Sequence, residues 1–202
     1  SSVAFSSNGS FLAVGFRDAH KVRVFKLIEG DQWEKVGPDI EGLGDGDNFG
    51  TAISISDDGM RLAIGAPYAG EDDHRGYTRV LQYSSNAWDQ LGDTIFGSEE
   101  VSYAGFSVSI SGNGERLAIG EPKAGSNTGL ARIFKLDLFS GVWVQIGQTL
   151  VGVGETDFFG FSLGMSQTGD IVAIGVLRSQ VNELKNAGRV KIYQLDETIT
   201  GG

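Results

Sequence analysis

Acidic side chains gather in the segments that separate the hydrophobic runs of this 202-residue chain. The densest cluster, at positions 71–74, has three carboxylates followed by a histidine, and such side chains bind metal ions or transfer protons. Asp47 and Asp157 each stand two residues before a Phe-Gly pair. The sequence therefore offers these candidate ligand-binding residues: Asp45, Asp47, Glu71, Asp72, Asp73, His74, Glu99, Glu100, Glu155 and Asp157.

Each of these acidic sites has a second interpretation that needs no ligand. Consecutive carboxylates cannot all point in one direction, so the 71–74 cluster fits a solvated loop as well as a metal site. An aspartate just before a tight turn often caps the backbone of that turn, which suits Asp47 and Asp157 better than catalysis. The acidic segments thus predict either a surface for cations and basic partners or loops kept soluble by their charge.

No arrangement of residues predicts catalysis. The chain has no cysteine, so a thiol nucleophile and a zinc–thiolate centre are excluded. Its two histidines, His20 and His74, are not spaced for a shared metal and have no recurring serine partner. We therefore predict no catalytic residue and a protein that is not an enzyme.

Charge and hydropathy restrict the partners. The formal net charge is −10, and such a field repels the phosphates of nucleic acids. No apolar run reaches the roughly 18–20 residues that cross a bilayer, so we expect no membrane span. No signal peptide is visible at the first residues, Ser1-Ser2-Val3.

The elements that carry the acidic segments belong to an internal repeat. Trp33, Trp88 and Trp143 stand 55 residues apart, and each is followed four residues later by glycine. Two further blocks recur in fixed order, as in Ile53-Ser-Ile-Ser-Asp-Asp-Gly-Met-Arg-Leu-Ala-Ile-Gly65 and Val108-Ser-Ile-Ser-Gly-Asn-Gly-Glu-Arg-Leu-Ala-Ile-Gly120. A period of this length is typical of stacked repeat architectures.

Within each block large and tiny side chains alternate with period two, which predicts β-strands. Both faces are free of charge, so we expect the bulky face of one sheet to pack on the small face of the next. Asn-Gly and Asp-Gly pairs favour type I′ hairpin turns between the first two strands. The turn glycines recur at the same place in every unit: Gly9, Gly59, Gly114 and Gly169.

The prediction is an all-β fold, a β-propeller with four visible four-stranded antiparallel blades of about 55 residues. We expect residues 1–202 to form a single repeat domain, with units at 1–48, 49–103, 104–158 and 159–202. The last unit lacks its Trp strand, and we expect the four units to be part of a larger propeller.

Other recurring residues are interpreted as scaffold. The tryptophans could be sugar-stacking platforms, but strict recurrence favours packing at the blade edge. One base recurs in the third strand of each unit and could form an anion-binding ring, although pairing with a nearby carboxylate is the simpler interpretation. These bases are Arg23, Arg79, Arg132 and Lys191.

The segment from Phe49-Gly50 to Gly65-Ala66-Pro67 resembles the FG-GAP repeat of integrin α-chain-like β-propellers. Ala104-Gly105 and Phe159-Gly160 hold the Phe-Gly place in later units. The resemblance implies a propeller, usually of seven blades, that is extracellular or at the cell surface and often adhesive. The family's calcium loop is not carried over, since a short turn cannot supply 6–8 oxygen ligands. No cofactor is certain, and calcium stays a possibility.

Any function then falls to the variable loops. In an antiparallel meander, the loops between strands two and three and between consecutive units lie on one rim, where binding usually occurs. We predict a non-catalytic binding, adhesion or scaffolding module that contacts a protein or polysaccharide. The alternatives are a carbohydrate-active enzyme with rim carboxylates and a structural repeat that self-associates into a wall, sheath or filament.

Overall fold

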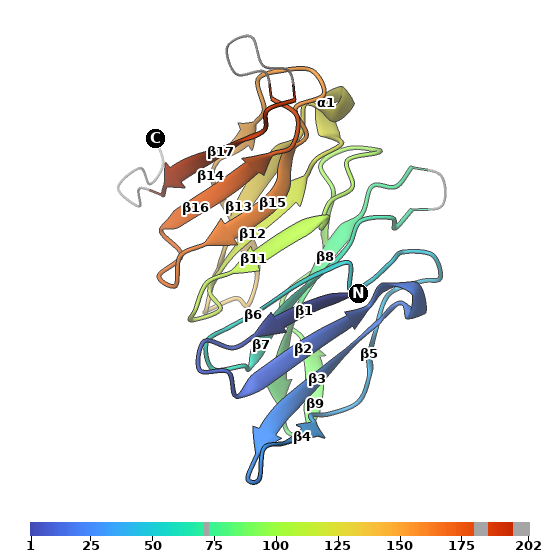
Figure 1. Cartoon of the computed structure of the whole chain (residues 1–202), viewed down its shortest axis with the longest axis vertical. Helices are drawn as coiled ribbons and strands as arrows, with labels where there is room; N and C mark the ends of the chain where they lie inside the picture. The colour runs from blue at the N-terminus through green and yellow to red at the C-terminus, as the bar shows by residue number, and fades with distance from the viewer. Residues whose placement is uncertain (71–72, 180–185, 196–202) are drawn as a thin grey trace.

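The computed structural model describes residues 1–70, 73–179 and 186–195. Four antiparallel sheets follow one another along the chain as the blades of a β-propeller, with the first and last blades at opposite ends of the molecule (Figure 1). The predicted all-β propeller with four visible blades is confirmed. No helix in the described part of the chain is long and apolar enough to cross a membrane.

The first two blades have the same strand order. Blade 1 contains β1 (Ser2–Phe5), β2 (Phe11–Phe16), β3 (Lys21–Ile28) and β4 (Gln32–Lys35), with β5 (Ile40–Glu41) also paired to β3. Blade 2 contains β6 (Ala52–Ile55), β7 (Arg61–Ala66), β8 (Tyr77–Ser84) and β9 (Ala87–Gln90), with β10 (Ile95–Phe96) also paired to β8. The outer strand is thus split into two pieces in both blades.

Blades 3 and 4 vary this plan. Blade 3 contains β11 (Ser107–Ile110), β12 (Arg116–Glu121), β13 (Leu130–Leu136) and one long outer strand, β14 (Trp143–Val151). Blade 4 contains β15 (Phe159–Met165), β16 (Ile171–Val176) and β17 (Arg189–Gln194). Single helical turns, η1 (Arg17–Ala19) and α1 (Ala124–Asn127), follow the second strands of blades 1 and 3.

The core lies between the blades. Leu62 and Ile64 of blade 2 pack toward blade 1, where they meet the small residue Ala13, and all three are fully buried. Leu117 of blade 3 packs in the same way against Ala63 of blade 2. Large residues of each blade therefore fill the space over small residues of the preceding one, as the alternation in the sequence predicted.

The Phe-Gly and second-strand glycines meet where consecutive blades approach most closely. Gly105 has a left-handed φ of 83°, and a Cβ on Gly65 would lie 1.9 Å from the carbonyl oxygen of Gly105. A Cβ on Gly120 would lie 2.1 Å from the carbonyl oxygen of Gly160. Backbone atoms cannot move aside as side chains do, so this contact requires glycine.

The hairpin turns differ from the prediction in type. Among the two central residues of the Asn8-Gly9 turn, only Gly9 has a positive φ, of 70°. Gly9 donates its N–H to the carbonyl oxygen of Ser6, and the Asn8 side chain accepts the N–H of Ser10. The type I′ prediction was wrong because the side chain at this position caps the turn and keeps its own residue out of the left-handed region.

Candidate functional site

The variable loops of blades 2 to 4 lie against the segments that enter each blade. The N–H of Tyr68, which follows β7, donates to the Asp47 carbonyl oxygen over 3.3 Å. Lys123, after β12, donates in the same way to Ser102, and Arg178, after β16, to Asp157. One backbone bond per blade thus joins the two sets of loops into a single rim.

Asp47 faces inward from this rim. Its side chain is 4% exposed and accepts the N–H groups of Leu43 at 3.1 Å and Phe49 at 2.9 Å, together with the hydroxyl of Tyr77. The His20 ring nitrogen Nδ1 lies 3.4 Å from the carboxylate. Burial and the hydrogen bond to Asp47 raise the pKa of Tyr77. These contacts cap the loop, and they leave the carboxylate little room to meet a ligand.

Asp157 is 5% exposed and has the same inward direction. It accepts the N–H of Gly154 at 3.0 Å and lies 3.4 Å from an Arg189 guanidinium nitrogen. In blade 3 the buried carboxylate comes instead from Glu121, at the end of β12. Glu121 is fully buried, accepts the N–H and hydroxyl of Ser98 at 2.8 and 2.7 Å, and pairs with Arg132. All three carboxylates hold loops in place.

The other predicted binding residues do not converge. Asp45, Glu99, Glu100 and Glu155 are exposed in the segments that enter blades 2, 3 and 4, and Glu99 accepts the N–H of Gly125. Asp73 accepts the N–H of Arg75. Glu71 and Asp72 lie outside the described residues. Across the described residues, no group of three His, Asp or Glu side chains is placed to hold a metal ion.

A continuous row of aromatic and basic side chains runs along the same rim. The Tyr68 and Tyr103 rings are 5.1 Å apart, and Lys123 Nζ lies 5.9 Å from the Tyr103 ring and 5.1 Å from the Phe158 ring. The Arg178 guanidinium carbon lies 5.3 Å from the centre of the Phe158 ring. We call this row across blades 2, 3 and 4 the rim ladder: Tyr68, Tyr103, Lys123, Phe158 and Arg178.

Two repeat positions build the rim ladder. Tyr68, Lys123 and Arg178 each stand three residues after the second-strand glycine, and Tyr103 and Phe158 each stand two before the Phe-Gly glycine. The backbone of Tyr103 and Phe158 is left-handed, with φ of 57° and 53°. Bulky residues rarely adopt this conformation, and such strain often marks functional loops.

His74 joins the blade 2 end of the rim ladder. Its ring lies 5.7 Å from Tyr68 and 5.4 Å from Tyr103. Sequence reasoning placed His74 in an acidic cluster and missed both tyrosines. The available signal was their fixed offset from the repeat glycines, but the residue types at these offsets change from blade to blade.

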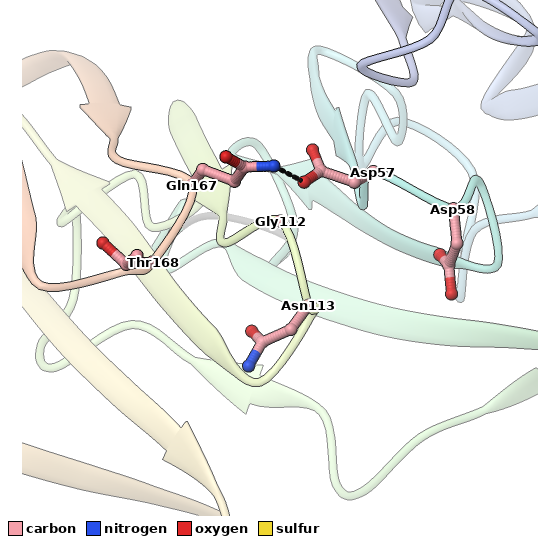
Figure 2. Close-up of a pocket in the computed structure, with 6 residues that line it drawn as sticks. All are labelled: Asp57, Asp58, Gly112, Asn113, Gln167 and Thr168. Atoms are coloured by element: carbon pink, nitrogen blue, oxygen red, sulfur yellow. Dashed lines mark hydrogen bonds between the residues drawn. The ribbon is translucent and has the colours of Figure 1, made fainter.

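The opposite rim is hollowed where the hairpin turns of blades 2 to 4 meet (Figure 2). This depression of about 510 Å³ is lined by Asp57, Asp58, Gly112, Asn113, Gln167 and Thr168. Gln167 donates its side-chain N–H to Asp57, and the Gly112 N–H donates to the Gln167 carbonyl oxygen at 2.8 Å. Its polar groups thus largely bind one another, and we regard it as a junction between turns.

The periodic bases do not form one ring of equivalent contacts. Arg23 pairs with Asp39, and Arg132 with Glu121, each inside its own blade. Arg79 instead donates to the Gln90 amide oxygen and the Glu41 carbonyl oxygen, and Lys191 lies 5.5 Å from the Phe159 ring. The expected partner carboxylate is therefore present for two of the four bases.

Asp39 gathers three bases of blade 1 around one carboxylate. Arg23 Nε lies 3.0 Å and Lys21 Nζ 3.4 Å from it, and Lys35 is also paired. Hydrogen bonds from Arg23 and Lys35 hold the pKa of Asp39 well below its usual range.

A pH series of unfolding will test this pairing. Because the folded state lowers the pKa of Asp39, its contribution is full above the ordinary aspartate pKa of about 3.9. It is lost as the pH falls through the folded value. We expect Asp39→Asn to lower the urea midpoint at pH 7 and to match the unmodified chain near pH 2. Asp31→Asn, at an exposed turn of the same blade, should leave the midpoint unchanged; an equal loss at every pH would contradict the pairing.

The repeat tryptophans connect neighbouring blades. Trp88 Nε1 donates to the Val36 carbonyl oxygen at 3.1 Å, and Trp143 Nε1 donates to the Leu91 carbonyl oxygen at 2.9 Å. These two side chains are 8% and 7% exposed, whereas Trp33 of blade 1 is 40% exposed. Trp88 and Trp143 are therefore parts of the blade interfaces.

No family model matches the chain, and no curated protein matches it in sequence. Solved structures do share its fold. Hydrazine synthase from Kuenenia stuttgartiensis is 18% identical with a TM-score of 0.61, over 96% of this chain and 50% of that one. A Bacteroides uniformis protein assigned as a 6-phosphogluconolactonase is 13% identical with a TM-score of 0.60, over 96% and 54%. TolB from Acinetobacter baumannii is 13% identical with a TM-score of 0.56, over 96% and 41%.

These likenesses show the β-propeller fold alone, because the identities are low. The chain spans about half of the structures it matches. The finer FG-GAP resemblance is not supported by them and stays a prediction. One neighbour is assigned as an enzyme and another is TolB, so this fold is compatible with catalysis as well as with binding.

Proposed function

We propose that these blades form a non-catalytic binding module that holds a polysaccharide chain along the rim ladder. The observation that carries the proposal is the unbroken row of rings and bases over three blades. Aromatic faces pack against the apolar faces of sugar rings, and a row of platforms suits an extended repeating ligand better than a compact one.

Charge selects a neutral or weakly charged polysaccharide. Lys123 and Arg178 offer N–H donors to sugar hydroxyls, and exposed Glu100 and Glu155 offer acceptors nearby in the chain. The net charge of −10 repels a dense polyanion. The FG-GAP resemblance adds an adhesive role and an extracellular or cell-surface location, which are parts of this proposal.

Binding measurements with purified polysaccharides test the proposal. Tyr103→Asn with Phe158→Asn should weaken the affinity for a bound neutral polysaccharide at least about tenfold, which corresponds to 1.4 kcal/mol. Asparagine tolerates the left-handed backbone at both places and already stands at the matching place in blade 1, Asn48. The fold should therefore survive, as circular dichroism would confirm.

Gln167→Ala, in the hollow of the opposite rim, is the matched control and should leave the affinity unchanged. Loss of binding in this variant, with the ladder variant unaffected, would place the ligand on the wrong rim. Release of reducing ends from the polysaccharide, abolished by Asp47→Asn or Asp157→Asn, would favour the enzymatic alternative. Binding restricted to a protein would reject the polysaccharide.

A further inference from the structure

The two ends of the blade stack expose surfaces that are buried everywhere else in the repeat. At the blade 1 end, Val3 is 67% and Phe5 57% exposed, although their counterparts in blade 3, Val108 and Ile110, are 8% and 6% exposed. Trp33 lies beside Phe5 with 6.0 Å between ring centres, so the bulky apolar face continues across the sheet. We call this surface the leading face.

Blade 4 exposes the opposite half of the interface. Val190 and Ile192 on β17 are 65% and 72% exposed, whereas Ala131 and Ile133, at the same places in blade 3, are 0% and 1% exposed. Those two residues of blade 3 are covered by blade 4. We call the exposed surface of blade 4 the trailing face.

Leading and trailing faces are the two halves of one contact that the chain already makes three times. Each internal interface joins the bulky side of one blade to the small-residue side of the blade before it. We infer that the leading face of one chain docks on the trailing face of a second copy, head to tail. The two copies close into one ring through two equivalent interfaces.

Closure follows from the geometry of the contact. A head-to-tail contact gives a ring when its rotation closes and an open filament when it does not. Two copies of four blades make eight, which is within the usual range of about 4–8 blades for propellers. Covering both apolar faces in a closed ring also removes the surface that would otherwise drive aggregation.

Internal hydrogen bonds predict which atoms meet in the new interface. Ser54 Oγ accepts the N–H of Ile110 at 3.0 Å, and Ser109 Oγ accepts the N–H of Met165 at 2.9 Å. The same two repeat positions at the free ends are Gly164 on the trailing face and Phe5 on the leading face. Gly164 of one copy should therefore lie against Phe5 of the other.

Sedimentation equilibrium of the full chain is the first test. We expect a species of twice the 21.5 kDa chain mass. Phe5→Asp and Ile192→Asp should each weaken the dimer by about thirtyfold or more, the usual size of an interface hot-spot loss. Phe139→Asp changes a fully exposed residue away from both faces and should have no effect. A monomer at every concentration, a dimer that survives both aspartate variants, or filaments that grow with concentration would overturn the ring.

Engineered disulfides are the second test, and the chain has no cysteine to interfere. Phe5→Cys combined with Gly164→Cys should give a covalent dimer on oxidation, because the two residues of one copy lie on opposite end blades. Ser109→Cys combined with Met165→Cys is the matched control and should give an internal disulfide in a chain of unchanged covalent mass. Oxidation of the control pair without cross-linking of the first pair would reject the proposed register.

Discussion

Gly65→Ala should lower the free energy of unfolding by about 3 kcal/mol, the upper part of the usual range for forcing extra atoms into a packed site. The added Cβ would lie 1.9 Å from the carbonyl oxygen of Gly105, where the backbones of blades 2 and 3 meet. Neither atom belongs to a side chain, so relief requires the blades to separate. Each kcal/mol lowers Tm by about 2–4 °C in a chain of this size, so we expect a fall of about 6–12 °C.

Gly164→Ala is the control for this prediction. Gly164 also lies in a strand, but a Cβ there would have no neighbour within 4 Å. This variant should match or slightly exceed the unmodified chain, because alanine loses less backbone entropy than glycine on folding. Equal thermal stability of the two variants would contradict the close approach of the blades.

Glu121→Ala should cost about 3–5 kcal/mol, the usual loss when one partner of a buried ion pair is removed. Glu121 is fully buried, and its loss leaves Arg132, the Ser98 N–H and the Ser98 hydroxyl without their acceptor. Urea unfolding at neutral pH measures the change. We expect Glu121→Leu combined with Arg132→Met to be much less destabilised, because both charges are then absent.

Glu115→Ala provides the comparison in the same blade. Glu115 lies at a hairpin turn, where its carboxylate accepts only an exposed Asn113 side-chain N–H among the described contacts. Its loss should fall within about 0.5 kcal/mol of the unmodified chain. A similar cost for both glutamates would mean that burial of Glu121 contributes nothing to stability.

Local patterns were sufficient for the scaffold. The 55-residue spacing of the tryptophans and the alternation of large and small residues predicted strands, blades and the order of their stacking. Such patterns are readable because every buried position in a repeat meets the same neighbours, so the same residue size recurs. The type I′ turns were the exception, since the Asn8 side chain caps the turn and competes with the backbone preference.

The candidate site was much less predictable. Acidic residues are conspicuous in the loop sequences, yet Asp47 and Asp157 turned inward to cap loops. The rim ladder uses residues of different types from blade to blade, and its rings meet across blades that are distant in sequence. A search for recurring residue types therefore selects scaffold positions and passes over the ligand candidates.

The sequence by itself determined the repeat, the all-β blades and the glycine positions, because these depend on local geometry and on contacts that recur in every unit. Only the tertiary structure decided which carboxylates are buried, which rings meet on the rim and which apolar faces stay exposed. The physical reason is that a carboxylate is equally polar whether it caps a loop or faces a ligand. Its direction is fixed by N–H donors, such as those of Leu43 and Phe49, that come together only after the chain has folded.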